Sequence, residues 1–195
     1  MTDIFMGFFL ATLIISLFTT RLFRLYSWYA LNSLFLGMIA MSVSFDINDN
    51  EMLVVGVITI IIKFLIIPFV LRDITLKFNL QRSIPLSIEN HFLVIVVPLI
   101  LAFTFYLIEP ISSMYLQSNY VTIAVSSLFL SLLLIMEHKT VSSKVLGFLF
   151  IENSLFLLAI SATKGMPMII ELGIFVDLMM FIVVINLLFK PQEEQ

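Results

Sequence analysis

Three ionisable residues lie near the middle of long apolar segments, where a charge is costly. Lys63 lies in ITIIIKFLIIPFV, Glu152 in GFLFIENSLFLLA and Asp177 in ELGIFVDLMMFIVV. An ion at the centre of a bilayer costs at least about 2.5–3.5 kcal/mol, so such residues usually face a bundle interior, a partner or water. Burial disfavours the charged form of each group, and a nearby opposite charge restores it. Carboxylates and an amine held in this balance can exchange protons near neutral pH, which predicts a role in ion translocation.

A purely structural role for these residues is the alternative. Lys63 would then pair with one of the two acids and tie helices together, while the other acid would meet a neighbouring subunit. Buried charge pairs stabilise a fold less than apolar packing does, and this favours translocation for Glu152 and Asp177. For Lys63 both interpretations stay open.

Four further ionisable residues are candidates for an accessory role. Glu171 lies about two turns before Asp177, where it would take up or release the ion or would simply start the helix in water. His138 ends the fifth apolar segment and could relay protons at physiological pH, although a histidine at a helix end more often reaches the lipid headgroups. Lys139 and Lys144 follow it in a short basic loop. Three asparagines inside the segments could hydrogen-bond across helices or hold water: Asn32, Asn153 and Asn186.

The composition excludes a soluble protein. Apolar residues make up 61% of the 195 residues and charged residues 12%, against about 45–50% and about 25% in soluble domains. The chain has no cysteine, which excludes a disulfide scaffold, a thiol-ligated metal and an iron–sulfur cluster. It has no phosphate-binding loop, no His cluster with metal spacing and no recognisable catalytic triad. We therefore expect an all-α integral membrane protein with no cofactor or metal of its own and, without a basic patch, no nucleic-acid partner.

Seven segments reach the length of about 20 mostly apolar residues that a membrane helix needs. They form a single transmembrane domain over residues 1–195, at about 3–20, 25–44, 52–71, 92–110, 119–136, 145–163 and 168–189. Basic residues concentrate on the cytoplasmic side of membrane proteins. If the chain has seven spans, most of its basic residues fall on one face of the membrane: Arg21, Arg24, Arg72, Lys77, Arg82, Lys139, Lys144 and Lys190. The charges thus support seven transmembrane helices with an N-out, C-in topology.

Short motifs in three of these segments resemble one family. A basic loop leads into GFLFIEN, a short turn follows, and the next helix contains ELGIFVD. This arrangement resembles the component E membrane subunit of hydrogenase-4-type, energy-converting complexes. The segment IIIKFLIIPFVL also resembles the Lys-and-Pro helix of that family. The likeness covers most of the chain.

The last three spans are more distantly similar to the K subunit of complex I and the C subunit of Mrp-type antiporters. That family carries one buried Glu on its second helix and another on its third. The resemblance implies that Glu152 corresponds to the first, by its place after a basic loop. Asp177 corresponds to the second by its distance from the inner end of the last span, with Glu171 as the alternative. The chain departs from the family in having Asp177 where the family has Glu, and in the thinner basic loop of Lys139 and Lys144.

The resemblance implies a non-catalytic subunit of an energy-converting respiratory complex in the prokaryotic cytoplasmic (inner) membrane. Its partners would be lipid, a proximal membrane subunit and antiporter-like pump subunits, and the NiFe and iron–sulfur centres would belong to those other chains. Glu152, Asp177 and Lys63 would take part in proton or sodium translocation coupled to electron transfer. The alternative is a small stand-alone ion transporter or an Mrp-type antiporter subunit.

Overall fold

The computed structural model describes residues 2–77, 83–85, 90–110 and 118–163. This part of the chain is all-helical and contains no β-strand, apart from an isolated bridge between Arg21 and Ser83. The helices are α1 (Thr2–Leu17), α2 (Leu22–Ile47), α3 (Asn50–Thr59), η1 (Ile60–Ile66), α4 (Ile67–Lys77), α5 (Asn90–Ile108), α6 (Ser118–Glu137) and α7 (Val141–Thr163). The segments α3, η1 and α4 form one continuous helix.

Within the described residues, 5 helices are long and apolar enough to cross a membrane: α2, the continuous helix α3–η1–α4, α5, α6 and α7. The shorter α1 is an apolar helix of 16 residues. The first six predicted segments coincide with these helices within a few residues. The seventh, 168–189, lies outside the described residues, so the number seven and the orientation stay predictions.

The helix of the third predicted segment continues beyond the apolar stretch, which was expected to end at about residue 71, because α4 extends to Lys77. Polar contacts hold this extra turn in place. The Arg72 guanidinium lies over the Phe23 ring, 5.8 Å from its centre, and the Thr75 hydroxyl is 2.7 Å from that of Tyr26 on α2. Hydropathy alone could not show that a charged turn continues the helix beyond the apolar stretch.

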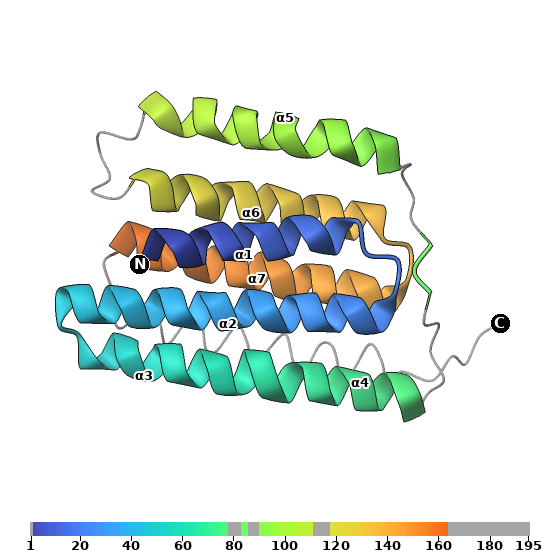
Figure 1. The fold of residues 1–195 in the computed structure, drawn as a ribbon, viewed down its shortest axis with the longest axis horizontal. Helices are drawn as coiled ribbons and strands as arrows, with labels where there is room; N and C mark the ends of the chain where they lie inside the picture. Colours follow the sequence, from blue (N-terminus) through green and yellow to red (C-terminus); the bar gives the residue numbers. More distant parts are fainter. Residues whose placement is uncertain (1, 78–82, 86–89, 111–117, 164–195) are drawn as a thin grey trace.

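The helices lie side by side in a bundle (Figure 1). The helix α1 packs against α2 and α6, and α7 also packs against α2 and α6, so these elements surround a common interior. The outer positions are taken by α5, which packs against α6, and by α3–η1–α4, which packs against α2.

A two-residue turn reverses the chain between α2 and α3. Asn48 adopts the left-handed conformation (φ 52°), and its N–H donates to the Ser44 carbonyl, which ends α2. The Asp49 side chain then accepts a hydrogen bond from the Glu51 N–H at 2.9 Å, which starts α3. The turn therefore sets α2 and α3 side by side and antiparallel.

Two glycines bring α2 and α3 into close contact. A Cβ atom on Gly56 would lie 3.0 Å from the Gly37 carbonyl oxygen and 2.7 Å from the Met41 side chain. A Cβ atom on Gly37 would lie 2.4 Å from the Ile60 side chain. The small residues thus fix how near α3, and the η1 segment that follows it, lies to the bundle interior.

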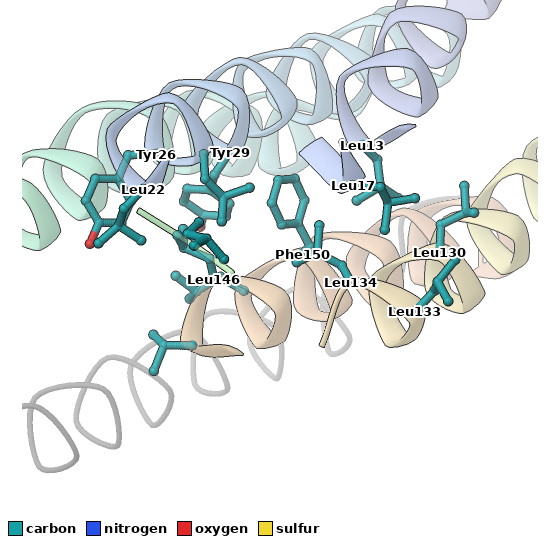
Figure 2. Close-up of a cluster of buried hydrophobic side chains, with 14 of the residues drawn as sticks. Leu13, Leu17, Leu22, Tyr26, Tyr29, Leu130, Leu133, Leu134, Leu146 and Phe150 are labelled. Atoms are coloured by element: carbon teal, nitrogen blue, oxygen red, sulfur yellow. The ribbon is translucent and has the colours of Figure 1, made fainter. Parts of the chain in front are cut away.

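Buried apolar residues form two clusters with polar residues between them. The first apolar cluster, shown in part in Figure 2, lies toward the α6–α7 turn and includes Leu17, Tyr29, Leu134, Leu146 and Phe150. The second lies toward the α2–α3 turn and includes Met6, Phe9, Leu36, Met52 and Leu157. We call the buried polar residues between the clusters the polar layer: Thr12, Asn32, Ser33, Lys63, Glu152 and Asn153.

Candidate functional site

Lys63 reaches the polar layer from the middle of η1, which is a π-helical segment. Its backbone N–H groups bond five residues back, as the Ile67 N–H does to the Ile62 carbonyl. Pro68 follows directly and has no N–H to continue a regular ladder. A π segment holds more residues per turn than an α-helix and often occurs at functional sites. It turns Lys63 inward, with a side chain only 1% exposed, whereas Ile61 stays exposed.

Lys63 and Glu152 form a buried ion pair between η1 and α7. The Lys63 Nζ atom lies 3.1 Å from Glu152 Oε1. Both residues are buried, with 1% and 6% of their surface exposed. The ammonium also lies 5.7 Å from the centre of the Phe156 ring, one turn further along α7. Among the described residues, Glu152 is therefore the acid that pairs with Lys63.

Amide groups continue the site from α7 into α2 and α1. Lys63 Nζ donates to Asn153 Oδ1 at 3.1 Å. Asn153 Nδ2 donates to Asn32 Oδ1 and to Ser33 Oγ, each at 3.0 Å. Asn32 Nδ2 donates to the Phe9 carbonyl at 2.9 Å and to Thr12 Oγ1 at 3.2 Å. The cross-helix role expected for Asn32 and Asn153 is confirmed.

Hydroxyl groups link α7 to α6 and α6 to α5. Ser154 Oγ lies 3.3 Å from Ser131 Oγ, and Thr104 Oγ1 lies 2.6 Å from Ser126 Oγ. Most of these hydroxyls also bond to a carbonyl of their own helix, as Ser154 does to Phe150. Sequence reasoning missed the serines and threonines, because such residues occur in membrane helices with their hydroxyls bonded to the preceding turn.

The second oxygen of Glu152 has no hydrogen-bond partner among the described residues. Glu152 Oε2 is buried, while Oε1 accepts from Lys63. A buried polar atom without a partner is costly, and more so when it carries charge. Binding a proton or a water at Oε2 would remove this cost.

His138 is buried at the α6–α7 turn. Its side chain is 0% exposed, and neither ring nitrogen has a hydrogen-bond partner among the described residues. Burial lowers the pKa of His138 to about 4, so the ring is neutral at pH 7. Sequence reasoning missed the burial of His138, because this burial depends on how the helices pack around the α6–α7 turn.

The accessory candidates do not gather at the ion pair. Lys139 and Lys144 are exposed near the same turn as His138, and Glu152 lies about 16 Å further along the axis of α7. Asp177 and Glu171 lie outside the described residues, as does Asn186. Among the described residues, no group of His, Asp and Glu side chains could hold a metal ion.

No protein-family model matches the chain, and no solved structure matches it. The chain is similar to the uncharacterized protein Rv0085 of Mycobacterium tuberculosis (strain ATCC 25618 / H37Rv), with 27% identity over 145 residues. The similarity covers 72% of this chain and 66% of that protein, just under two thirds of its length. The function must therefore be argued from the polar layer.

Proposed function

We propose that this chain is a non-catalytic membrane subunit of an energy-converting respiratory complex and takes part in proton or sodium translocation through its polar layer. In this proposal the chain crosses the cytoplasmic membrane of a prokaryote seven times with its N-terminus outside. Redox centres such as NiFe and iron–sulfur clusters belong to partner subunits. The resemblance to component E subunits supports the type of complex in this proposal, and the buried ion pair supports the role in ion translocation.

The observation that carries the proposal is the buried Lys63–Glu152 pair, in which Glu152 Oε2 has no partner within the described part of the chain. A carboxylate with a free buried oxygen can accept a proton there, and the adjacent ammonium keeps the ionised form accessible. Polar side chains that extend from the pair into neighbouring helices are typical of ion pathways in membranes. Clusters of buried apolar residues lie on both sides of the layer.

Proton transfer through Glu152 balances without any further reactant. A proton binds Glu152 Oε2 and forms an O–H bond, so the carboxylate becomes neutral while Lys63 keeps its three protons. The proton then leaves Oε2 for the next acceptor, and the carboxylate pairs with Lys63 again. We propose Asp177 as that acceptor, with Glu171 as the alternative.

Glu152→Gln tests the proposal, because the amide keeps the shape of the side chain and cannot carry the proton. Proton uptake and electron transfer are measured together in inside-out membrane vesicles. We expect the complex to assemble and the number of protons moved per electron to fall by at least about tenfold. Glu51→Gln, at an exposed position at the start of α3, is the matched control and should behave like the parent chain. Normal pumping by an assembled Glu152→Gln complex would overturn the proposal.

A stand-alone transporter or Mrp-type antiporter subunit is the second candidate. It is favoured by the fact that the ion pair and its amide contacts all lie inside one chain. Purification in mild detergent separates the two. A stable homo-oligomer without other subunits supports the transporter, and co-purification of hydrogenase-like or pump subunits supports the respiratory complex.

A further inference from the structure

The hydrogen bonds of the polar layer all run in one direction, away from Lys63. An ammonium group has donors and no acceptor, so the oxygen of the Asn153 amide must face it. The Asn153 nitrogen then faces α2 and needs acceptors, which Asn32 Oδ1 and Ser33 Oγ provide at 3.0 Å. The Asn32 nitrogen in turn faces α1, where the Phe9 carbonyl accepts at 2.9 Å. The charge of Lys63 thus fixes the orientation of both amides.

Neither side-chain amide can flip by 180° without losing hydrogen bonds. A flipped Asn153 would place its NH₂ group against the Lys63 ammonium and its oxygen against the acceptors on α2. A flipped Asn32 would place its oxygen against the Phe9 carbonyl. Hydrogen bonds aligned in a chain polarise one another, so the two amide dipoles together present a strengthened acceptor to the ammonium.

We propose that Asn153 and Asn32 form an amide relay that holds Lys63 charged and in place while Glu152 gains and loses its proton. Lys63 Nζ lies 3.1 Å from both Glu152 Oε1 and Asn153 Oδ1. When Glu152 becomes neutral, its charge no longer attracts the ammonium, while the hydrogen bond from Lys63 Nζ to Asn153 Oδ1 stays in place. The relay therefore makes the protonated state of Glu152 accessible, and Asn153 and Asn32 are positioning residues. The biological use of the relay rests on the proposed function, whereas its effect on Glu152 does not.

The titration of Glu152 depends on the charged and titratable side chains around it. Among the described residues, Lys63 is the charged group in contact with it. The other buried titratable side chains of this part are Tyr26 and Tyr29 on α2, and Glu137 and His138 at the α6–α7 turn.

The test is a pH titration of Glu152 by infrared spectroscopy on the full-length chain, purified with the subunits that accompany it. The carbonyl band of the protonated carboxyl is assigned to Glu152 by its absence in Glu152→Gln. We expect Asn153→Leu to move the midpoint of the band by about one pH unit toward acid, since one hydrogen bond to a charged group is lost. A carbonyl band that is present at every pH would also support the relay, because Lys63 would then have given its proton to Glu152.

A second variant and a matched control separate the relay from general damage to the fold. Asn32→Leu touches neither Lys63 nor Glu152 directly, and it should shift the midpoint in the same direction by a smaller amount. Ser154→Ala removes a hydroxyl next to Asn153 that bonds to Ser131 and Phe150 instead, and it should leave the midpoint unchanged. Midpoints equal to that of the parent chain in both asparagine variants would overturn the relay.

The pumping assay keeps the two proposals distinguishable. If Glu152→Gln abolishes pumping while Asn153→Leu leaves the titration unchanged, the relay fails and the proposed function stands. If the titration shifts as expected while Glu152→Gln pumps normally, the proposed function fails and the relay stands.

Discussion

At the scale of single residues, the Lys63–Glu152 pair is a costly arrangement. Removing two ions from water costs several kcal/mol each, and their attraction offsets this only when the remaining polar atoms are satisfied. Glu152 Oε2 has no such partner among the described residues. Two apolar side chains of similar volume would stabilise the bundle as well or better. The pair therefore fits a group that changes its charge better than a group that only joins two helices.

His138 predicts how the stability of the protein depends on pH. Burial lowers the pKa of His138 to about 4, from an ordinary value of 6.5. Because the unfolded chain binds this proton first, the stability is full above about pH 6.5 and falls as the pH decreases toward about 4. The decrease from this one residue amounts to at most about 3 kcal/mol.

Thermal unfolding of the purified protein between about pH 6.5 and about pH 4 checks this prediction. We expect His138→Leu to flatten the decline of Tm toward acid. His91→Leu, at an exposed position at the start of α5, should keep the decline of the parent chain. If His138→Leu declined as steeply as the parent chain, other groups would be responsible.

At the scale of elements, the close contact of α2 and α3 and the π segment η1 together position Lys63. The contact at Gly37 and Gly56 sets the distance of the helix from the interior. The π segment then sets the direction of Lys63 within that helix. A change in either element would move the ammonium away from Glu152.

Gly56→Ala should therefore destabilise the fold by about 1–3 kcal/mol, because overpacking forces neighbouring backbones apart. The added Cβ would lie 3.0 Å from the Gly37 carbonyl oxygen, which belongs to the backbone and cannot move aside alone. Gly7→Ala is the matched control, since a Cβ there would meet nothing within 4 Å and alanine favours a helix by up to about 1 kcal/mol. Thermal unfolding of the two variants measures the difference, and equal Tm values would contradict the role of Gly56.

Sequence reasoning located the six described apolar helices and singled out both members of the ion pair, but it left open which acid pairs with Lys63 and how the pair is held. Lys63 and Glu152 could be singled out because a charge in an apolar segment is rare and costly. The direction of Lys63 depends on the π turn, which no periodicity of 3.6 residues predicts. The contributions of Ser33 and Thr12 depend on which helices are neighbours, and this is decided by packing across the whole bundle.

At the scale of the whole molecule, the polar layer lies between two clusters of buried apolar residues. The hydrogen bonds of the layer run across the bundle, from η1 through α7 and α2 to α1. The polar contacts of the described residues therefore extend across the bundle and connect four of its helical segments.

The proposed topology can be tested directly because the chain has no cysteine. Single cysteines introduced by Glu51→Cys and Lys139→Cys lie at exposed positions at opposite ends of the bundle. With the N-terminus outside, a membrane-impermeant maleimide should label the first variant in intact cells and the second only after permeabilisation. The reverse pattern would show that the chain is inserted the other way round.

The π segment also constrains how the gene can change in length. Insertions and deletions are normally tolerated in loops, and the turns of this bundle are the expected places for them. Between Gly56 and Pro68, however, the loss of one residue would restore regular α-helical winding and change the direction in which Lys63 projects relative to the residues on either side. In this stretch the number of residues is as much a requirement as the lysine itself.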